Sequence, residues 1–211
     1  MIRTFSAAGY RDLCDDLAAR DRDLRRVLEN FGYPPMWTRP NTFETLVHII
    51  LEQQVSLASA LAALNKLRQQ LGTVAPEAFL QLSDETLRAC YFSRQKTAYV
   101  RILAEALVSG AVSLHEMEQL PDEEVRKRLG ALKGIGNWTI DVYLMFALQR
   151  VDLFPVGDLA AVNAMKTLKS LPRETKRDTL TGLAGGWAPY RTVATMILWH
   201  FYLSSRKPAR R

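Results

Sequence analysis

The chain has 211 residues, of which 48% are hydrophobic and 24% are charged. This balance excludes a disordered or fibrous protein and predicts one large globular domain or two small packed lobes. Lys and Arg total 28 against 22 for Asp and Glu, a net charge of +6 that suits a polyanionic partner. The longest uncharged run near the C-terminus, 192–203, is too short to span a bilayer, and we see no secretory signal. We therefore expect a cytoplasmic protein.

The cysteines and histidines do not predict a metal centre. Cys14 and Cys90 are too far apart for a CxxC-type site, and two cysteines cannot form a four-cysteine iron–sulfur cluster. The histidines are scattered and no acidic cluster accompanies them, so no catalytic metal is expected. His48 and His200 have apolar neighbours, and we expect both to be buried and hydrogen-bonded.

The first strong helical pattern begins near residue 42. Asn41 and Glu44 have the spacing of a capping box, and apolar residues recur at helical intervals from Phe43 onwards. This pattern predicts one long amphipathic helix over 42–69. Ser93 can cap a second helix, whose apolar positions run to Ala106.

The remaining elements are also helical. Pro121 is placed at the first position of a third helix, followed by three acidic residues that complement the helix dipole, and this helix should end near Gly130. No segment alternates convincingly with a period of two, so the predicted class is all-α. Further helical patterns cover 137–149, 159–170 and 188–203. Joints rich in Gly, Pro or aromatic residues are expected at 31–40, 151–157 and 182–186.

The segment 132–139, Leu-Lys-Gly-Ile-Gly-Asn-Trp-Thr, predicts a helix, a tight turn and a second helix. Gly134 and Gly136 permit positive φ and let backbone N–H groups approach an anion. The first turn of the next helix adds N–H donors and a positive dipole end, so one DNA phosphate could be held without any base being read. Lys127 and Lys133 add positive charge. Alternatively, the two glycines simply end one helix and open the next.

The wider pattern resembles the helix-hairpin-helix DNA glycosylase superfamily, and within it the alkylation-repair, 3-methyladenine type II branch. The hairpin is followed by an aromatic-proline loop and by an Asp 20 residues after Trp138. Four further segments agree in order: Ile-Ile-Leu-Glu-Gln-Gln-Val-Ser at 49–56, Ser-Arg-Gln-Lys at 93–96, Phe-Pro-Val-Gly-Asp at 154–158 and Pro-Tyr-Arg at 189–191. The resemblance spans roughly 42–203. Lys133 departs from the family, which commonly has Pro there.

The resemblance implies a single glycosylase unit over 1–211, made of two packed helical lobes with the active-site cleft between them. One lobe would be 41–150, with the hairpin, and the other would combine 1–40 with 151–211. The implied partner is double-stranded DNA that contains a damaged base, bound by a monomer.

Asp158 is the candidate catalytic residue. It precedes a helical pattern that begins at Leu159, where an Asp is usually an N-cap. The resemblance implies that Asp158 also faces the base pocket, and the two roles are compatible because helix N-terminal amides favour a charged carboxylate. A fixed carboxylate stabilises the positive charge that builds on the sugar as the base departs, and it can orient the attacking water.

Trp138 argues against strand cleavage. Superfamily members that cut the strand carry a nucleophilic Lys two residues beyond the second glycine, and this chain has Trp138 there. Lys133 precedes the glycines, so Schiff-base and lyase chemistry are not expected. Trp138, Tyr143 and Trp199 are candidate walls of a pocket for positively charged alkylated bases, held by cation–π attraction. For Tyr143, a core position is the preferred interpretation.

Other residues are candidates for contact with DNA. Gln54 matches the family's wedge position, which fills the gap left by an extruded base, although a polar residue where a helix meets solvent is an equal alternative. The full candidate set is Gln53, Gln54, Ser56, Arg94, Lys96, Lys133, Gly134, Gly136 and Thr139. No cofactor is required, but family hairpins often hold a monovalent cation, Na⁺ or K⁺, and here the carbonyls of Leu132 and Ile135 would bind it.

Two other functions fit parts of this pattern. A glycosylase for oxidised or mismatched bases is the alternative enzyme, although the absent Lys and cluster cysteines count against its commoner forms. A non-enzymatic helix-hairpin-helix module that docks on DNA fits the charge and the hairpin equally well. Such a module would not need Asp158 at its observed spacing.

Overall fold

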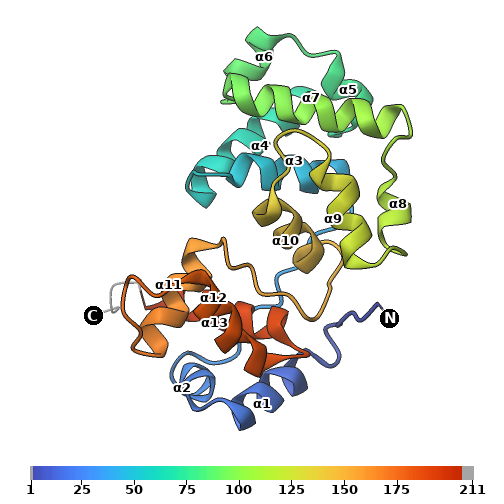
Figure 1. The fold of residues 1–211 in the computed structure, drawn as a ribbon. Coiled ribbons are helices and arrows are strands. Elements are labelled where there is room, and N and C mark those ends of the chain that lie inside the picture. The colour runs from blue at the N-terminus through green and yellow to red at the C-terminus, as the bar shows by residue number, and fades with distance from the viewer. Residues whose placement is uncertain (1, 206–211) are drawn as a thin grey trace. The chain divides into compact units, whose positions relative to one another are not determined.

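The computed structural model describes residues 2–205, which form helices joined by turns and loops (Figure 1). The β-bridge pairing among these residues is a single isolated antiparallel bridge between Thr4 and Arg150. The all-α prediction is therefore confirmed. In this part of the chain, no helix has both the length and the apolar character that crossing a membrane would need.

The chain divides into two compact units. Unit 1 consists of Arg39–Leu148 together with Ile2, and unit 2 consists of Arg3–Thr38 together with residues 149–205. The helices of unit 1 are α3 (Phe43–Glu52), α4 (Leu57–Leu71), α5 (Pro76–Leu80), α6 (Asp84–Ala89), α7 (Arg94–Val108), α8 (Leu114–Met117), α9 (Asp122–Gly130) and α10 (Asn137–Phe146). Those of unit 2 are α1 (Tyr10–Arg20), α2 (Arg22–Phe31), α11 (Leu159–Leu168), α12 (Arg177–Ala184), the 3₁₀ helix η1 (Gly185–Trp187) and α13 (Arg191–Ser204).

Helix α3 is the centre of unit 1, where it packs against α4, α7 and α10. It is apolar nearly all round, and Leu46, Val47, Ile49 and Ile50 are fully buried. Burial of each such side chain contributes roughly 1.5–3 kcal/mol, so α3 forms a fixed base for the hairpin between α9 and α10. Figure 1 shows that hairpin as the yellow loop leading into α10.

Helix α13 has the same role in unit 2, where it packs against α1, α2 and α11. Every residue from Thr192 to Leu198 is buried. A helix that is buried on all sides holds its neighbours on several faces. Asp152 and Arg191 then fasten the loop before α11 to the start of α13, since the guanidinium binds both carboxylate oxygens, at 2.6 and 2.9 Å.

The predicted long helix over 42–69 is wrong, because the chain forms two helices, α3 and α4, with a turn between them. Gln54 in that turn has a φ of +58°, which ends the helical path. Ser56 then starts α4 as its N-cap and accepts a hydrogen bond from the Ser59 N–H at 3.1 Å. The apolar pattern continues through the turn, because both helices bury a face in the same core.

Smaller differences concern helix ends and joints. Thr42, and not Asn41, caps α3. Pro121 is the N-cap of α9 and not its first helical residue, so α9 begins one residue later than predicted, at Asp122. The expected joint at 182–186 is occupied by the end of α12 and by η1. Helices α10, α11 and α13 are shorter than their patterns, while α9 ends at Gly130 and Ser93 caps α7, as predicted.

Candidate functional site

The hairpin in unit 1 is a tight turn between α9 and α10. Gly134 has a φ of +95°, in the region that favours glycine. It also lies against the ring of Tyr99, and a Cβ at this position would be 2.0 Å from the ring atom Cγ. Gly136 has an ordinary φ of −94° and forms the N-cap of α10. Of the two glycines that permit a positive φ, Gly134 adopts one and Gly136 does not.

Gln53 braces this hairpin. Its side-chain nitrogen Nε2 donates to the Gly134 carbonyl at 2.8 Å and to the Thr139 hydroxyl oxygen at 2.9 Å. Thr139 is almost fully buried. The structure gives both residues contacts inside the protein, and their expected contact with DNA stays a prediction. The sequence could not indicate this hydrogen bond, because Gln53 and Gly134 are 81 residues apart and meet only in the folded protein.

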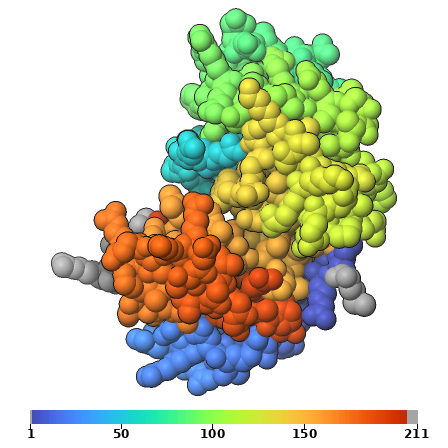
Figure 2. Space-filling model, in the orientation of Figure 1, coloured from blue at the N-terminus to red at the C-terminus, as the bar shows by residue number. Residues whose placement is uncertain are grey.

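A surface groove of about 630 Å³ adjoins the hairpin. Its lining includes the 53–55 turn, the start of α7 and residues 132–136, and no acidic residue is among the lining residues. Figure 2 shows the yellow hairpin residues at the surface beside the green of α7. Tyr91, which the sequence analysis did not single out, also lines the groove; it is 63% exposed and has a φ of +67°. An unpaired base or a backbone phosphate would meet donors and aromatic rings here, without acidic side chains.

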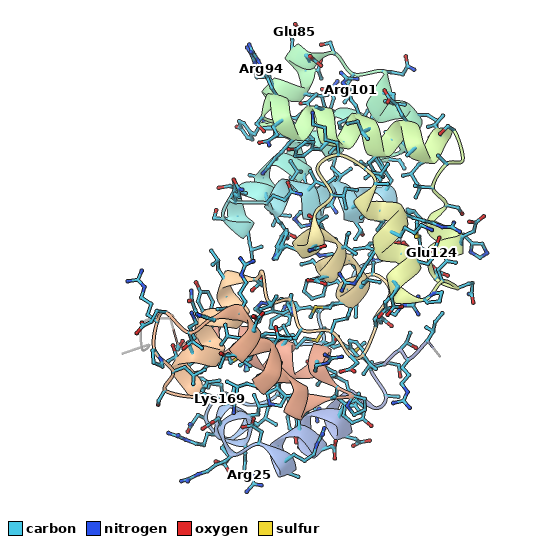
Figure 3. All side chains as sticks on the ribbon, viewed as in Figure 1. Arg25, Glu85, Arg94, Arg101, Glu124 and Lys169 are labelled. Atoms are coloured by element: carbon cyan, nitrogen blue, oxygen red, sulfur yellow. The ribbon has the colours of Figure 1, made fainter. Side chains whose placement is uncertain are left out.

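The basic candidates differ in their surroundings. Arg94 and Lys133 are exposed, and Figure 3 shows Arg94 projecting outward from the start of α7. Lys96 is half-buried, and its ammonium group donates to the Leu51 carbonyl near the end of α3. Burial lowers the pKa of Lys96. Lys96 thus supports the turn that carries Gln54, while Arg94 and Lys133 remain available to phosphate.

Of the two aromatic candidates in unit 1, Trp138 is half-buried in the first turn of α10. Tyr143 is fully buried, and its hydroxyl donates to the Asn41 side-chain oxygen at 2.6 Å. This hydrogen bond satisfies a polar atom that would otherwise be costly to bury. We therefore assign Tyr143 to the core of unit 1 and not to a base pocket.

In unit 2, Asp158 caps α11. Its oxygen Oδ1 accepts a hydrogen bond from the Ala161 N–H at 2.8 Å and another from the Trp199 indole N–H at 2.9 Å. The side chain is half-buried. Two donors on one oxygen fix the orientation of the carboxylate at the start of α11. Asp158 is thus both an N-cap and the partner of one of the predicted pocket tryptophans.

Trp37 extends this group and was missed by the sequence analysis. Its ring packs edge-to-face on Trp199, with ring centroids 6.3 Å apart and an interplanar angle of 79°. Trp37 lies in the 31–40 joint, where aromatic content was noticed but no helical period pointed to a partner. Unit 2 therefore joins a carboxylate to two indole rings from distant parts of the chain.

The loop before Asp158 is held at several points. The Leu153 N–H donates to the Thr192 hydroxyl oxygen at 3.1 Å, and the Phe154 ring packs against Trp187. Burial opposes ionisation of Asp152, but hydrogen bonds from Arg191 outweigh it, and the pKa of Asp152 is lowered. The loop is consequently tied to α13, the helix that also carries Trp199.

The cysteines and histidines occupy supporting positions. Cys14 and Cys90 are both buried, and they form no disulfide with each other. His48 is half-buried with its Nε2 atom 3.5 Å from Glu52, and burial lowers the pKa of its imidazole. The His200 ring contacts the Phe31 carbonyl at 2.9 Å. Within residues 2–205, no group of three His, Cys, Asp or Glu residues is arranged to hold a metal ion.

Residues 47–189 match the family described as the HhH-GPD superfamily base excision DNA repair protein. This chain belongs to that superfamily. It is 32% identical to DNA-3-methyladenine glycosylase 1 of Schizosaccharomyces pombe, over 87% of this chain and 83% of that protein. The similarity supports the branch of the superfamily that the sequence motifs resemble.

Two solved structures agree in fold. A 3-methyladenine DNA glycosylase from Schizosaccharomyces pombe, in complex with abasic DNA, superimposes with a TM-score of 0.79 at 29% identity, covering 89% of this chain and 95% of that one. A DNA-3-methyladenine glycosidase from Bacillus halodurans gives a TM-score of 0.78 at 32% identity, covering 97% of this chain and 95% of the other.

Proposed function

We propose that this protein is a monofunctional DNA glycosylase that hydrolyses the N-glycosidic bond of alkylated bases, such as 3-methyladenine, in double-stranded DNA. It would act as a monomer. The observation that carries the proposal is Asp158, a helix-capping carboxylate that also accepts the indole N–H of a half-buried tryptophan. Membership of a base excision repair superfamily and the net charge of +6 support DNA as the partner.

The proposed chemistry centres on the charge of Asp158. As the bond between C1′ and the base nitrogen breaks, the base takes the bonding electron pair and the sugar becomes positively charged. The Asp158 carboxylate stabilises this charge without first having to reorient, because its hydrogen bonds already fix it. Water adds to C1′ and releases a proton, so the products are the free base and an abasic site.

The tryptophans are proposed to select the base. Alkylation often leaves a base positively charged, and an electron-rich indole face attracts a cation. Trp199 is the proposed face in unit 2, where Trp37 is added because it packs on Trp199, and Trp138 is a separate candidate in unit 1. The Trp199 N–H is donated to Asp158, so the ring is oriented by the same carboxylate that acts on the sugar.

The hairpin is proposed to hold the DNA strand. The N–H groups at the start of α10, where the N-cap Gly136 has no side chain, would bind one phosphate without reading a base, and the exposed Lys133 would add attraction. The exposed Gln54 would fill the gap that the extruded base leaves.

A monovalent cation at the hairpin is part of the proposal. The carbonyls of Leu132 and Ile135, both of which line the groove, would bind Na⁺ or K⁺. Leu132 already accepts the Ile135 N–H at 3.1 Å, but a carbonyl oxygen has a second lone pair that can serve an ion. Such an ion would add positive charge beside the phosphate.

The direct test is base release. DNA treated with a methylating agent is incubated with the purified protein, and the released bases are identified by mass spectrometry. We expect methylated purines, with 3-methyladenine among them. Release of oxidised or mismatched bases instead, from matched substrates, would favour the alternative enzyme. Tight DNA binding without any base release would make the protein a docking module.

We also expect intact abasic sites after base release, because Trp138 occupies the position of the nucleophilic lysine in strand-cutting members. Borohydride added during the reaction should trap no covalent adduct, since no Schiff base forms. Denaturing gel electrophoresis measures both results. A protein–DNA crosslink that requires borohydride would contradict the monofunctional assignment.

A further inference from the structure

One side chain joins the turn after α3 to the hairpin. The Gln53 amide nitrogen carries two hydrogens, and it donates to the Gly134 carbonyl at 2.8 Å and to the Thr139 hydroxyl oxygen at 2.9 Å. The two acceptors lie on opposite sides of Gly136, one in the turn and one in the first turn of α10. Gln53 therefore fixes the turn, the start of α10 and the end of α3 relative to one another.

The next residue along the chain, Gln54, is the proposed wedge. It is exposed and has a φ of +58°, a conformation that residues other than glycine rarely adopt. Lys96 holds the Leu51 carbonyl on one side of the turn, and Ser56 caps α4 on the other. The first contact fixes the end of α3 to α7, the second fixes the start of α4, and the Gln53 contacts fix the turn to the hairpin.

We infer that Gln53 is a positioning residue that couples the Gln54 turn to the hairpin, so that the wedge and the phosphate-binding amides act at a fixed separation. The inference rests on the proposed function, because it concerns DNA with an extruded base. Without the coupling, the hairpin still binds a phosphate while the wedge can withdraw from the duplex. The expected loss is therefore specific to DNA in which a gap must be filled.

The test replaces Gln53 by Met, which has a similar shape, no charge and no hydrogen to donate. Affinity is measured for an undamaged duplex and for a duplex with an abasic-site analogue beside 2-aminopurine, whose fluorescence rises on unstacking. We expect Gln53→Met to lower the preference for the abasic-analogue duplex about tenfold, because the half-buried Gly134 carbonyl and the buried Thr139 hydroxyl both lose their donor. The fluorescence rise should fall with it, and affinity for undamaged DNA should change less than about twofold.

Three further variants complete the test. Gln70→Met, an exposed glutamine on α4, is the matched control and should behave as wild type. Thr139→Val, which loses one acceptor, should lower the preference about threefold, whereas Thr139→Ser should retain it. If Gln53→Met does not fold, the Thr139 pair decides the question.

An equal loss of affinity for both duplexes would overturn the inference, because it would show a merely structural role. An unchanged preference in Gln53→Met, or equal behaviour of Thr139→Val and Thr139→Ser, would overturn it as well. If the wild-type protein neither prefers the abasic-analogue duplex nor raises the fluorescence, then the proposed function fails instead.

Discussion

Asp158→Asn should reduce the rate of base release by about 10³-fold or more, because the charge that stabilises the cationic sugar is lost. The fold should survive, since Asn has nearly the same shape and is as good an N-cap as Asp. Its side-chain oxygen can still accept from the Ala161 N–H and from the Trp199 indole. Single-turnover base release from methylated DNA measures the rate, and thermal unfolding measures the stability.

The matched control is Asp16→Asn, which removes the same charge from an aspartate of unit 2 that is half exposed and paired with Arg20 on α1. That surface pair is worth little, so stability should change by less than about 1 kcal/mol and base release should be unaffected. Affinity for an abasic-analogue duplex should be similar for both variants. A wild-type rate in Asp158→Asn would remove this residue from the chemistry and leave the helix cap as its role.

Features set by neighbouring residues were predictable from the sequence. The Ser93 cap of α7 and the Asp158 cap of α11 both depend on hydrogen bonds that span three residues. The turn at Gly134 could be recognised because few residues other than glycine adopt its backbone conformation. For Asp158, the neighbouring residues predict only the helix cap, and its candidacy as a catalytic residue came from the resemblance to the glycosylase superfamily.

Features set by distant contacts were not predictable. Nothing near Gln53 indicates that its amide binds a carbonyl 81 residues away, and the apolar pattern from α3 into α4 conceals the turn between them. The helices α1 and α2 were also missed. They meet at Asp21, which caps α2 and accepts hydrogen bonds from Lys169 and the Trp187 indole. These two donors follow Asp21 by 148 and 166 residues. Figure 3 labels Lys169 where it faces α2.

The candidate pocket residues show the same difference between features that local sequence predicts and features that distant contacts set. Tyr143 and Trp138 lie on the same short helix, and sequence alone could only express a preference for placing Tyr143 in the core. The structure decides the matter for Tyr143 through complete burial and the hydrogen bond to Asn41. Trp37 became a candidate only through its contact with Trp199, since aromatic packing between distant segments leaves no periodic pattern.

Gly134→Ala should lower the free energy of unfolding by about 3 kcal/mol or more, whereas Gly136→Ala should cost less than about 1 kcal/mol. At Gly134, the added methyl group would lie 2.0 Å from the Tyr99 ring, and the φ of +95° disfavours any side chain. At Gly136, φ is ordinary and no atom lies within 4 Å of an added Cβ. Chemical denaturation of the two variants measures the difference.

The same pair separates the hairpin's structural role from its proposed role as a phosphate clamp. Gly136→Ala places a methyl group beside the amides that would bind phosphate, so it should weaken binding to all DNA sequences alike without changing the ranking of substrates. Tyr99→Ala, combined with Gly134→Ala, should recover part of the lost stability, because it removes the clash and leaves the backbone strain. Circular dichroism must accompany each binding assay. Unchanged DNA affinity in a folded Gly136→Ala variant would show that phosphate does not bind at these amides, and the hairpin would then serve only to connect α9 to α10.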